Sequence, residues 1–447
     1  MAKKSRKVKV KNKRVSGQAK KKIKVLAYCD SPTCATGFAT VSRNIFEGLY
    51  RTGRFDIEIL GINYWGDPHN FPYRIWPTGT NNQKDPYGRQ KVLNMIPLMD
   101  FDILFFLQDS FILNFVPMLL DHLKKNRNKP FRSICYYPVD SIIKQEWADN
   151  IKDVDYLVAY SEFGKKETLK RIDRDILVIP HGVNTRDFYT LPESEVMNFR
   201  KQYFGPLADT FIITNVNRNQ QRKDIPRTIA VFEEFRKHVP NSTLYLHCAI
   251  KDQGWDLAEV CKTFGFDTSK DVIFPKNFGP NQGYPREVLN LIYNASDVVI
   301  STTLGEGFGL SWLESLAAKT PILMPANTML PEFITEDIGW LAKSGSNPSL
   351  WTTIQFDNEV RRPMVDVEDM VEKLLEIYNN REEAKRRAEN GYKWVTTKMD
   401  WQKHIVPQWV KLFDEAYTDM VLNVNKQKEE AVNIVDTIGK VIETEEF

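Results

Sequence analysis

A glycine-rich turn between a strand and a helix, residues 305–314, constrains the fold of this chain more than any other stretch. The apolar run before it, residues 297–302, is predicted to be a buried parallel strand, and residues 311–319 carry apolar side chains at helical spacing. Glycines let the backbone pass close to a ligand, and free amides at the start of a helix attract anionic groups. A ligand site is therefore expected where this strand ends.

Two carboxylates flank the start of the predicted helix. Glu306 lies just before it and Glu314 about two turns later, so one carboxylate can meet each end of an elongated, hydroxyl-rich ligand. An ionised carboxylate is a strong acceptor for sugar hydroxyls. The alternative is an ordinary strand-to-helix turn with two surface glutamates, because glycine is common at such turns.

The size of the chain and its charge narrow the possibilities further. A chain of 447 residues, 42% hydrophobic and 27% charged, is long enough for two sizeable α/β domains. No apolar run reaches the roughly 18 residues of a membrane span, and no apolar segment follows the basic start as in a secretory signal. The net charge of +3 divides into +11 on residues 1–22 and −8 on the remainder, which predicts a basic, disordered tail. Five cysteines without a Cys-x-x-Cys pair indicate a reducing, cytoplasmic setting, without a disulfide framework or structural zinc.

The first half of the chain alternates predicted strands and helices. A strand at residues 22–30 is followed by a turn at residues 31–40 and a helix at residues 41–49. Doubly wound folds place a phosphate at such a turn, and Gly37 is expected nearest to it; a simple turn is the alternative. The further strands predicted in this half are residues 57–62, 103–107, 133–137, 156–160 and 176–179.

A basic loop follows the first strand predicted in the second half, residues 211–216. Arg218 and Lys223 lie five positions apart in this loop, and Arg222 is close by. A departing diphosphate gains negative charge, which a planar Arg fork and a mobile Lys charge can stabilise. The alternative is a solvated basic loop without a ligand.

These motifs together resemble those of one enzyme family. Glu306 and Glu314 around Gly-Phe-Gly match the E-x7-E signature of family-4-like retaining glycosyltransferases of the GT-B fold, and Arg218 and Lys223 resemble their R-x4-K pair. The resemblance covers roughly residues 22–420. It implies an α/β fold of the GT-B type, in which two Rossmann-like domains face each other across a cleft and a C-terminal helix crosses back to the first domain.

The resemblance also divides the chain into parts. The implied parts are a basic tail at residues 1–22, an acceptor-side domain at 23–190, a nucleotide-sugar-binding domain at 208–400, a crossover helix at 401–420 and a polar tail at 421–447. Residues 178–188 resemble the family segment that leads from one domain to the other. His181 within it is expected to be a turn residue.

The resemblance further implies the chemistry. The reaction would retain the anomeric configuration, need neither metal nor cofactor, and transfer a hexose or pentose from a nucleotide-sugar. A UDP-sugar is the first choice of donor, with GDP- and ADP-sugars as alternatives, because these donors share the motifs. Glu306 would hold the sugar hydroxyls and Glu314 the ribose. The remaining donor contacts are expected from Gly37, Arg218, Lys223, Asn277 in the nucleobase loop at 275–278, and the amides of Phe308, Gly309 and Leu310.

Three Asp-x-Asp strings suggest a Mg²⁺ or Mn²⁺ site of the kind used by the other large glycosyltransferase class. They are Asp100/Asp102, Asp153/Asp155 and Asp173/Asp175. Each pair directly precedes a predicted strand, which places it on the sheet edge opposite the usual ligand side. We therefore interpret them as strand-entry turns and predict no metal site.

The first domain departs from the family pattern at one position. Members often carry a His after the strand that corresponds to residues 133–137, and this sequence has none there. Asp140 is the candidate that could contact the sugar or the acceptor proton, and Tyr137 is the second candidate. The alternative role for Asp140 is the N-cap of a helix that starts at Ser141.

The acceptor is the least constrained part of the hypothesis. A saccharide or lipid-linked hydroxyl is the first choice, and hydroxymethylated DNA bound through the basic tail is the alternative. The same tail could attract an anionic membrane surface or simply aid solubility. A catalytically silent GT-B binding protein is a hypothesis of another class. It is disfavoured because Arg218, Lys223, Glu306 and Glu314 are all present.

Overall fold

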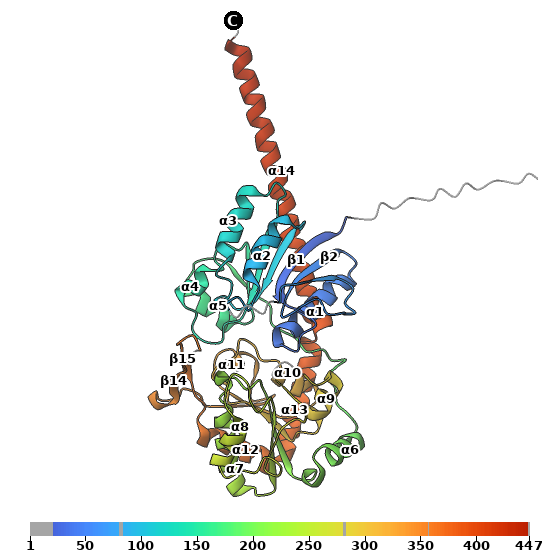
Figure 1. The fold of residues 1–447 in the computed structure, drawn as a ribbon, viewed down its shortest axis with the longest axis vertical. Helices are drawn as coiled ribbons and strands as arrows, with labels where there is room; N and C mark the ends of the chain where they lie inside the picture. Colours follow the sequence, from blue (N-terminus) through green and yellow to red (C-terminus); the bar gives the residue numbers. More distant parts are fainter. Residues whose placement is uncertain (1–20, 80–83, 280–282, 356, 446–447) are drawn as a thin grey trace, which may run out of the picture.

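The computed structural model describes residues 21–79, 84–279, 283–355 and 357–445. The chain forms two parallel sheets covered by helices, which lie one above the other along the long axis of the molecule (Figure 1). The basic tail predicted at residues 1–22 lies outside the described residues except for Lys21 and Lys22. No helix in the described part is long and apolar enough to cross a membrane.

The first sheet has the order β3-β2-β1-β4-β5-β6-β7. Its strands are β1 (Ile23–Asp30), β2 (Phe55–Ile62), β3 (Arg74–Pro77), β4 (Ile103–Leu107), β5 (Arg132–Tyr137), β6 (Tyr156–Ala159) and β7 (Ile176–Val178). The helices are α1 (Gly37–Arg51), α2 (Arg89–Met95), η1 (Ile96–Leu98), α3 (Val116–Asn126), α4 (Gln145–Asp149) and α5 (Glu162–Leu169). All five residues of β4 are buried, as expected for a parallel strand between two layers. The order of strands reverses between β1 and β4, which is where doubly wound folds bind their ligands.

The second sheet has the order β10-β9-β8-β11-β12-β13. Its strands are β8 (Phe211–Val216), β9 (Ser242–His247), β10 (Val272–Ile273), β11 (Val298–Ile300), β12 (Ile322–Pro325) and β13 (Trp340–Ala342). The helices before the crossover are α6 (Glu193–Tyr203), η2 (Gly205–Leu207), η3 (Gln221–Lys223), α7 (Ile225–His238), α8 (Leu257–Thr263), α9 (Arg286–Asn294), α10 (Ser311–Ala317), α11 (Leu330–Phe333), η4 (Pro348–Leu350), α12 (Val367–Asn379) and α13 (Arg381–Lys398). A separate antiparallel hairpin, β14 (Trp351–Thr353) and β15 (Arg361–Pro363), projects beside the seam between the two domains (Figure 1).

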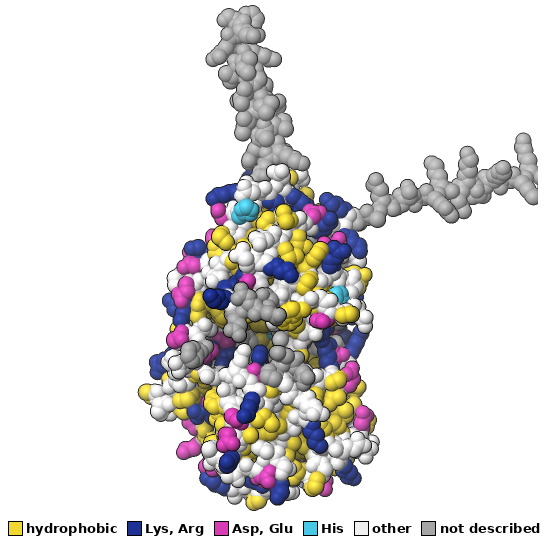
Figure 2. All heavy atoms as spheres, in the orientation of Figure 1, with side chains coloured by type: hydrophobic (Ala, Val, Ile, Leu, Met, Phe, Trp, Pro, Cys, Tyr) yellow, Lys and Arg dark blue, Asp and Glu magenta, His cyan; other side chains and the backbone are white. Residues whose placement is uncertain are grey.

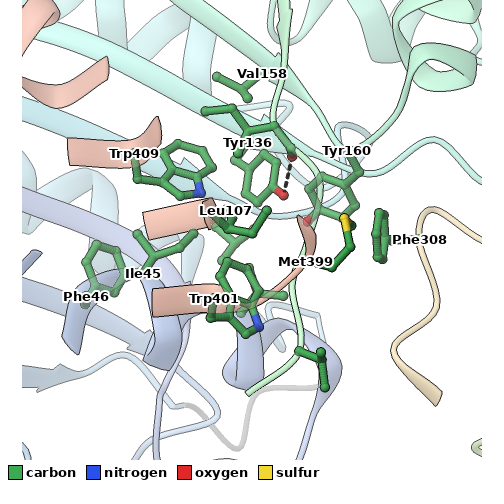
Figure 3. Close-up of a cluster of buried hydrophobic side chains, with 14 of the residues drawn as sticks. Ile45, Phe46, Leu107, Tyr136, Val158, Tyr160, Phe308, Met399, Trp401 and Trp409 are labelled. Atoms are coloured by element: carbon green, nitrogen blue, oxygen red, sulfur yellow. Dashed lines mark hydrogen bonds between the residues drawn. The ribbon is translucent and has the colours of Figure 1, made fainter. Parts of the chain in front are cut away.

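The C-terminal helix crosses back onto the first domain. After the π-helical turn η5 (Trp401–Ile405), α14 (Val406–Glu445) runs behind the first sheet and beyond it (Figure 1). Trp409 packs edge-on against Phe105 of β4 and Tyr136 of β5, with ring centroids 5.6 Å and 4.6 Å apart. Figure 3 shows this cluster, in which Phe308 of the second domain also approaches Tyr160 of the first. One hydrophobic core therefore joins both domains and the crossover helix.

The structure differs from the sequence-based expectation at two helices. The crossover helix does not end at residue 420 but continues through the predicted polar tail to Glu445, because residues 421–445 contain no proline to stop it. No helix starts at Ser141: α4 begins at Gln145, so Asp140 is not its N-cap. The carboxylate of Asp140 is bound instead by arginines of the second domain.

The Asp-x-Asp pairs lie at strand entries, as predicted. Asp102 precedes β4 and accepts a hydrogen bond from the Lys24 amide at 2.8 Å. Asp155 precedes β6 and accepts one from the Ser133 amide at 2.8 Å. In the part of the chain that the structure describes, no three His, Cys, Asp or Glu side chains gather as a metal site would need.

Candidate functional site

The two domains meet where β5 and β11 end. A side chain at residue 305 would place its Cβ only 2.0 Å from the carbonyl oxygen of Asp140, and a Cβ at residue 307 would lie 2.6 Å from Cβ of Pro138. Only glycine fits at such distances. Gly305 and Gly307 therefore allow the glycine-rich turn to touch the first domain directly.

A chain of alternating charges crosses this contact. The Lys223 ammonium is bonded to the Glu306 carboxylate, and each of these residues is only 8% exposed. Arg222 donates to the Gly305 carbonyl at 2.6 Å, and its guanidinium lies 3.5 Å from Glu306 and 3.1 Å from Asp140. Asp140 of the first domain is thereby linked to Glu306 and Lys223 of the second.

The charges of this network support one another. Burial alone would raise the pKa of the Glu306 carboxyl, but Lys223 and Arg222 hold it below its ordinary value. Burial would likewise raise the pKa of Asp140, and Arg362 and Arg222 lower it overall. Burial lowers the pKa of Lys223 to about 8, with Glu306 opposing the shift. Both carboxylates are therefore ionised at neutral pH and Lys223 is largely charged.

Asp109 is a third carboxylate at the same sheet edge, two residues after β4. Burial, together with the nearby charge of Asp140, raises its pKa to about 7, although Arg222 opposes the shift. Among the described residues, no side chain or amide donates a hydrogen bond to its carboxylate. Asp109 is thus the group of this edge that can exchange a proton near neutrality.

Glu314 lies apart from Glu306, in the first turn of α10. Its carboxylate accepts a hydrogen bond from the Tyr293 hydroxyl at 2.7 Å. Burial raises its pKa to about 7. The two predicted carboxylates therefore occupy different surroundings: Glu306 is ion-paired, whereas Glu314 is bonded to a neutral hydroxyl.

Phe308, Gly309 and Leu310 form the turn that leads into α10. Gly309 has φ of 78°, a conformation that side chains rarely adopt, and it precedes the helix start at Ser311. Phe308 is buried, and its carbonyl accepts a hydrogen bond from the Trp312 indole at 3.0 Å. Leu310 is the N-cap residue.

Arg218 does not join the network around Lys223. Its guanidinium makes two hydrogen bonds to the Asp252 carboxylate, at 2.6 Å and 3.1 Å, and its side chain is 40% exposed. The predicted Arg-Lys pair is therefore divided in this structure, with Lys223 buried on Glu306 and Arg218 at the rim.

Gly37 and Asn277 also lie away from the network. Gly37 is the first residue of α1, whose N-cap Thr36 donates a hydrogen bond to the Asp30 carboxylate at 2.6 Å. Among the described residues, apart from its chain neighbours and its own helix turn, no heavy atom lies within 4 Å of where a Cβ on Gly37 would be. Asn277 is exposed in the loop after β10, with φ of 53°. Next to it, Phe278 packs on His247 with ring centroids 4.9 Å apart.

Two other residues singled out in the sequence have structural surroundings. His181 is buried, and its Nδ1 shares a hydrogen bond of 2.7 Å with the Tyr136 hydroxyl. Burial lowers the pKa of its imidazole to about 3, so the ring is neutral. Tyr137 is fully buried, and its hydroxyl donates a hydrogen bond to the Thr168 hydroxyl at 3.1 Å instead of contacting the network. Of the two first-domain candidates, only Asp140 contacts the network.

The sequence analysis missed Asp109 and Arg362. Asp109 follows a correctly predicted strand, as Asp140 does, so the rule that ligands gather at the carboxyl ends of parallel strands could have identified it. Arg362 lies on the β14–β15 hairpin and bonds the Asp140 carbonyl at 2.9 Å. Nothing in the sequence around residues 351–363 indicates that this hairpin returns to the first domain.

Comparisons with known proteins concern part of the sequence and the fold as a whole. Residues 199–355 match the family model described as glycosyl transferases group 1. The alpha-monoglucosyldiacylglycerol synthase of Acholeplasma laidlawii is 27% identical over 165 residues, which is 37% of this chain and 39% of that protein. The chain spans less than half the length of the first curated relatives that it matches, with 39% and 46% of them covered.

Two solved structures share the whole fold. Sucrose-phosphate synthase from Thermosynechococcus elongatus has a TM-score of 0.69 at 16% identity, over 89% of this chain and 100% of that one. HepE from Anabaena in complex with UDP-glucose has a TM-score of 0.65 at 14% identity, over 88% and 100%. The predicted GT-B fold with two Rossmann-like domains is confirmed. The resemblance to glycosyltransferases is likewise confirmed, by the family model in the second domain.

Proposed function

We propose that this chain, which resembles the group 1 glycosyl transferases in its second domain and GT-B enzymes in its whole fold, is itself a glycosyltransferase. It would transfer a sugar from a nucleoside-diphosphate donor to a hydroxyl of a saccharide or lipid-linked acceptor. The observation that carries this proposal is the buried network of Glu306, Lys223 and Arg222, which contacts Asp140 of the first domain. This network would offer two cations and a carboxylate to a sugar diphosphate.

Donor binding would rearrange the ion pair at the centre of this network. An incoming diphosphate competes with Glu306 for Lys223, and the released carboxylate can then accept hydrogen bonds from sugar hydroxyls. Arg218 at the rim could turn from Asp252 to the same diphosphate. A UDP-sugar is the favoured donor, since HepE, of the same fold, is described in complex with UDP-glucose.

The transfer would retain the anomeric configuration without a metal. As the bond to the sugar lengthens, Lys223, Arg222 and the backbone amides of Phe308, Gly309 and Leu310 would stabilise the negative charge on the diphosphate. Glu306 and the ionised Asp140 would stabilise the positive charge that develops on the sugar ring. Side chains would thus supply the positive charge that a metal ion supplies in other glycosyltransferases.

The acceptor is proposed from two observations. A relative named for the synthesis of a glucosyldiacylglycerol supports a hydroxyl of a lipid-linked or saccharide acceptor. On the face shown in Figure 2, basic, acidic and apolar side chains are interspersed over both domains, without a continuous basic surface for a nucleic acid.

A donor and acceptor panel tests the proposed function. The full chain would be heated with UDP-, GDP- and ADP-sugars, and diphosphate release would be followed with a soluble saccharide, with diacylglycerol vesicles and with hydroxymethylated duplex DNA. We expect stabilisation by one nucleotide class, and release with the saccharide or the vesicles. Release with the DNA alone would replace the proposed acceptor. A protein that no donor stabilises and that releases nothing would be a silent binding protein.

The role proposed for Glu314 predicts a pH-dependent effect on donor binding. Ribose hydroxyls bind an ionised carboxylate more strongly, and the pKa of Glu314 of about 7 means that ionisation increases between pH 6 and pH 8. The ratio of the donor Kd of Glu314→Gln to that of the wild type should therefore grow by about tenfold over this range. Calorimetry at both pH values measures it, and a ratio that stays constant contradicts the role.

Asp109 predicts uptake of a proton when the donor binds. A diphosphate adds negative charge near a carboxyl whose pKa is already about 7, which raises that pKa further and favours the protonated form. Binding at pH 7.5 should take up roughly half a proton. Calorimetry in buffers with different ionisation enthalpies measures this uptake, and Asp109→Asn should abolish it. Uptake that persists in the variant would assign the proton to another group.

A further inference from the structure

Arg362 makes the most extensive side-chain contact that reaches from the second domain to Asp140. Its guanidinium donates to the Asp140 carbonyl at 2.9 Å and lies 3.3 Å from one oxygen of the Asp140 carboxylate. The other edge of the guanidinium binds Asp357, which lies within the same hairpin segment. Arg362 thus binds both the backbone carbonyl and the carboxylate of Asp140.

The burial of Arg362 is unusual for a residue of a small two-stranded hairpin. Its side chain is only 2% exposed, and a buried guanidinium is stable only when its charge and donors are matched. Its neighbour Arg361, on the opposite face of β15, is exposed and lies over the Trp351 ring at 4.6 Å. Arg361 thus points to solvent and contacts only its own hairpin, whereas Arg362 is buried against Asp140 of the first domain. We therefore assign Arg362 to the contact between the domains.

The two arginines bound to Asp140 both belong to the second domain. Arg222 approaches one carboxylate oxygen at 3.1 Å, whereas Arg362 approaches the other oxygen and also the carbonyl. Separation of the domains would break these contacts together and leave the carboxylate free to rotate. The match to the group 1 family model ends at residue 355, before Arg362.

We propose that Arg362 is a positioning residue, which fixes the orientation of the Asp140 carboxylate from the opposite domain and so makes that orientation depend on the contact between the two domains. Its consequence for turnover rests on the proposed function; the contact itself does not. Two of the proposed donor contacts, Lys223 and Glu314, belong to the second domain and do not bond Arg362. Loss of Arg362 should therefore affect the rate of transfer and leave the affinity for the donor unchanged.

Hydrogen exchange and kinetics of three variants test this role. Arg362→Met removes the contact, Arg362→Lys keeps the charge without the planar fork, and Arg361→Met is the matched control. In Arg362→Met we expect backbone exchange over residues 139–142 to become faster, because the loop that Arg362 ties to the second domain is released. We expect kcat to fall by about 10- to 100-fold, since a small misplacement of a reacting group costs that much. The donor Kd should stay within about twofold of the wild type.

The controls make the outcomes decisive. Arg361→Met should match the wild type, and Arg362→Lys should restore part of kcat. Unchanged exchange in Arg362→Met, or an equal loss of donor affinity and kcat, would overturn the proposal. Should Arg362→Met fail to fold, Arg362→Lys carries the same comparison. A wild-type protein without turnover would refute the proposed function instead, and the exchange measurement would still decide whether Arg362 holds Asp140.

Discussion

Replacement of Glu306 by glutamine should lower the rate of transfer by about 10²–10³-fold, the largest loss expected among substitutions in the second domain. The neutral amide can still accept a hydrogen bond, but it cannot stabilise positive charge on the sugar ring. It also deprives Lys223 of its partner. Burial already lowers the pKa of Lys223 to about 8, and loss of Glu306 should lower it further, so the lysine would be partly neutral at pH 7.5. The diphosphate would then lose a cation as well.

The measurement is donor-dependent release of the diphosphate under single-turnover conditions. Glu336→Gln is the matched control, because Glu336 is an exposed glutamate of the same domain. Glu306→Gln should become more impaired as the pH rises, because the neutral form of Lys223 then increases. A folded Glu306→Gln protein that keeps its rate within about threefold would contradict the proposed role of the network.

The fold was predictable because the residues that determine it act locally. Apolar runs of five to eight residues, such as β4 and β1, alternate with helices and glycine turns, and this alternation predicts parallel sheets. The reach of α14 was underestimated for a physical reason: its polar composition suggested a tail, yet nothing in it interrupts a helix.

The candidate site was only partly predictable because it depends on contacts between distant segments. Glu306 and Lys223 were named from motifs, and their burial as a pair brings together residues 83 positions apart. Arg222 was noted only as a neighbour, although it makes the link to Asp140. Arg362 lies 222 positions from Asp140, and no local pattern encodes such a pairing. Arg218 shows the reverse case. It was named from the family motif, but in this structure its guanidinium is paired with the Asp252 carboxylate and not with the network.

The contrast between two aspartates at the same sheet edge gives the second large prediction. Asp140→Asn should lower kcat by about 10²–10³-fold across the range above pH 5. A pH dependence near 7 should persist but move to lower pH, because the charge of Asp140 helps to raise the pKa of Asp109. Arg362 and Arg222 hold the pKa of this carboxyl below its ordinary value despite its burial, so it is ionised throughout that range. Its contribution would be a fixed negative charge beside the sugar, and the loss of that charge is the same at every pH.

Asp109→Asn should show the opposite behaviour, with a smaller loss of rate and a changed pH profile. The wild-type carboxyl titrates near pH 7, so any acid or base step that it assists must vary with pH in that region. Profiles of kcat from pH 5 to pH 9 for both variants separate these roles, with Asp209→Asn, an exposed aspartate, as the control. If Asp140→Asn removed the pH dependence near 7 instead, Asp140 would be the proton-transferring group. The two arginines would then have to leave it during the reaction, and the closed network described above would represent only the state before the substrates bind.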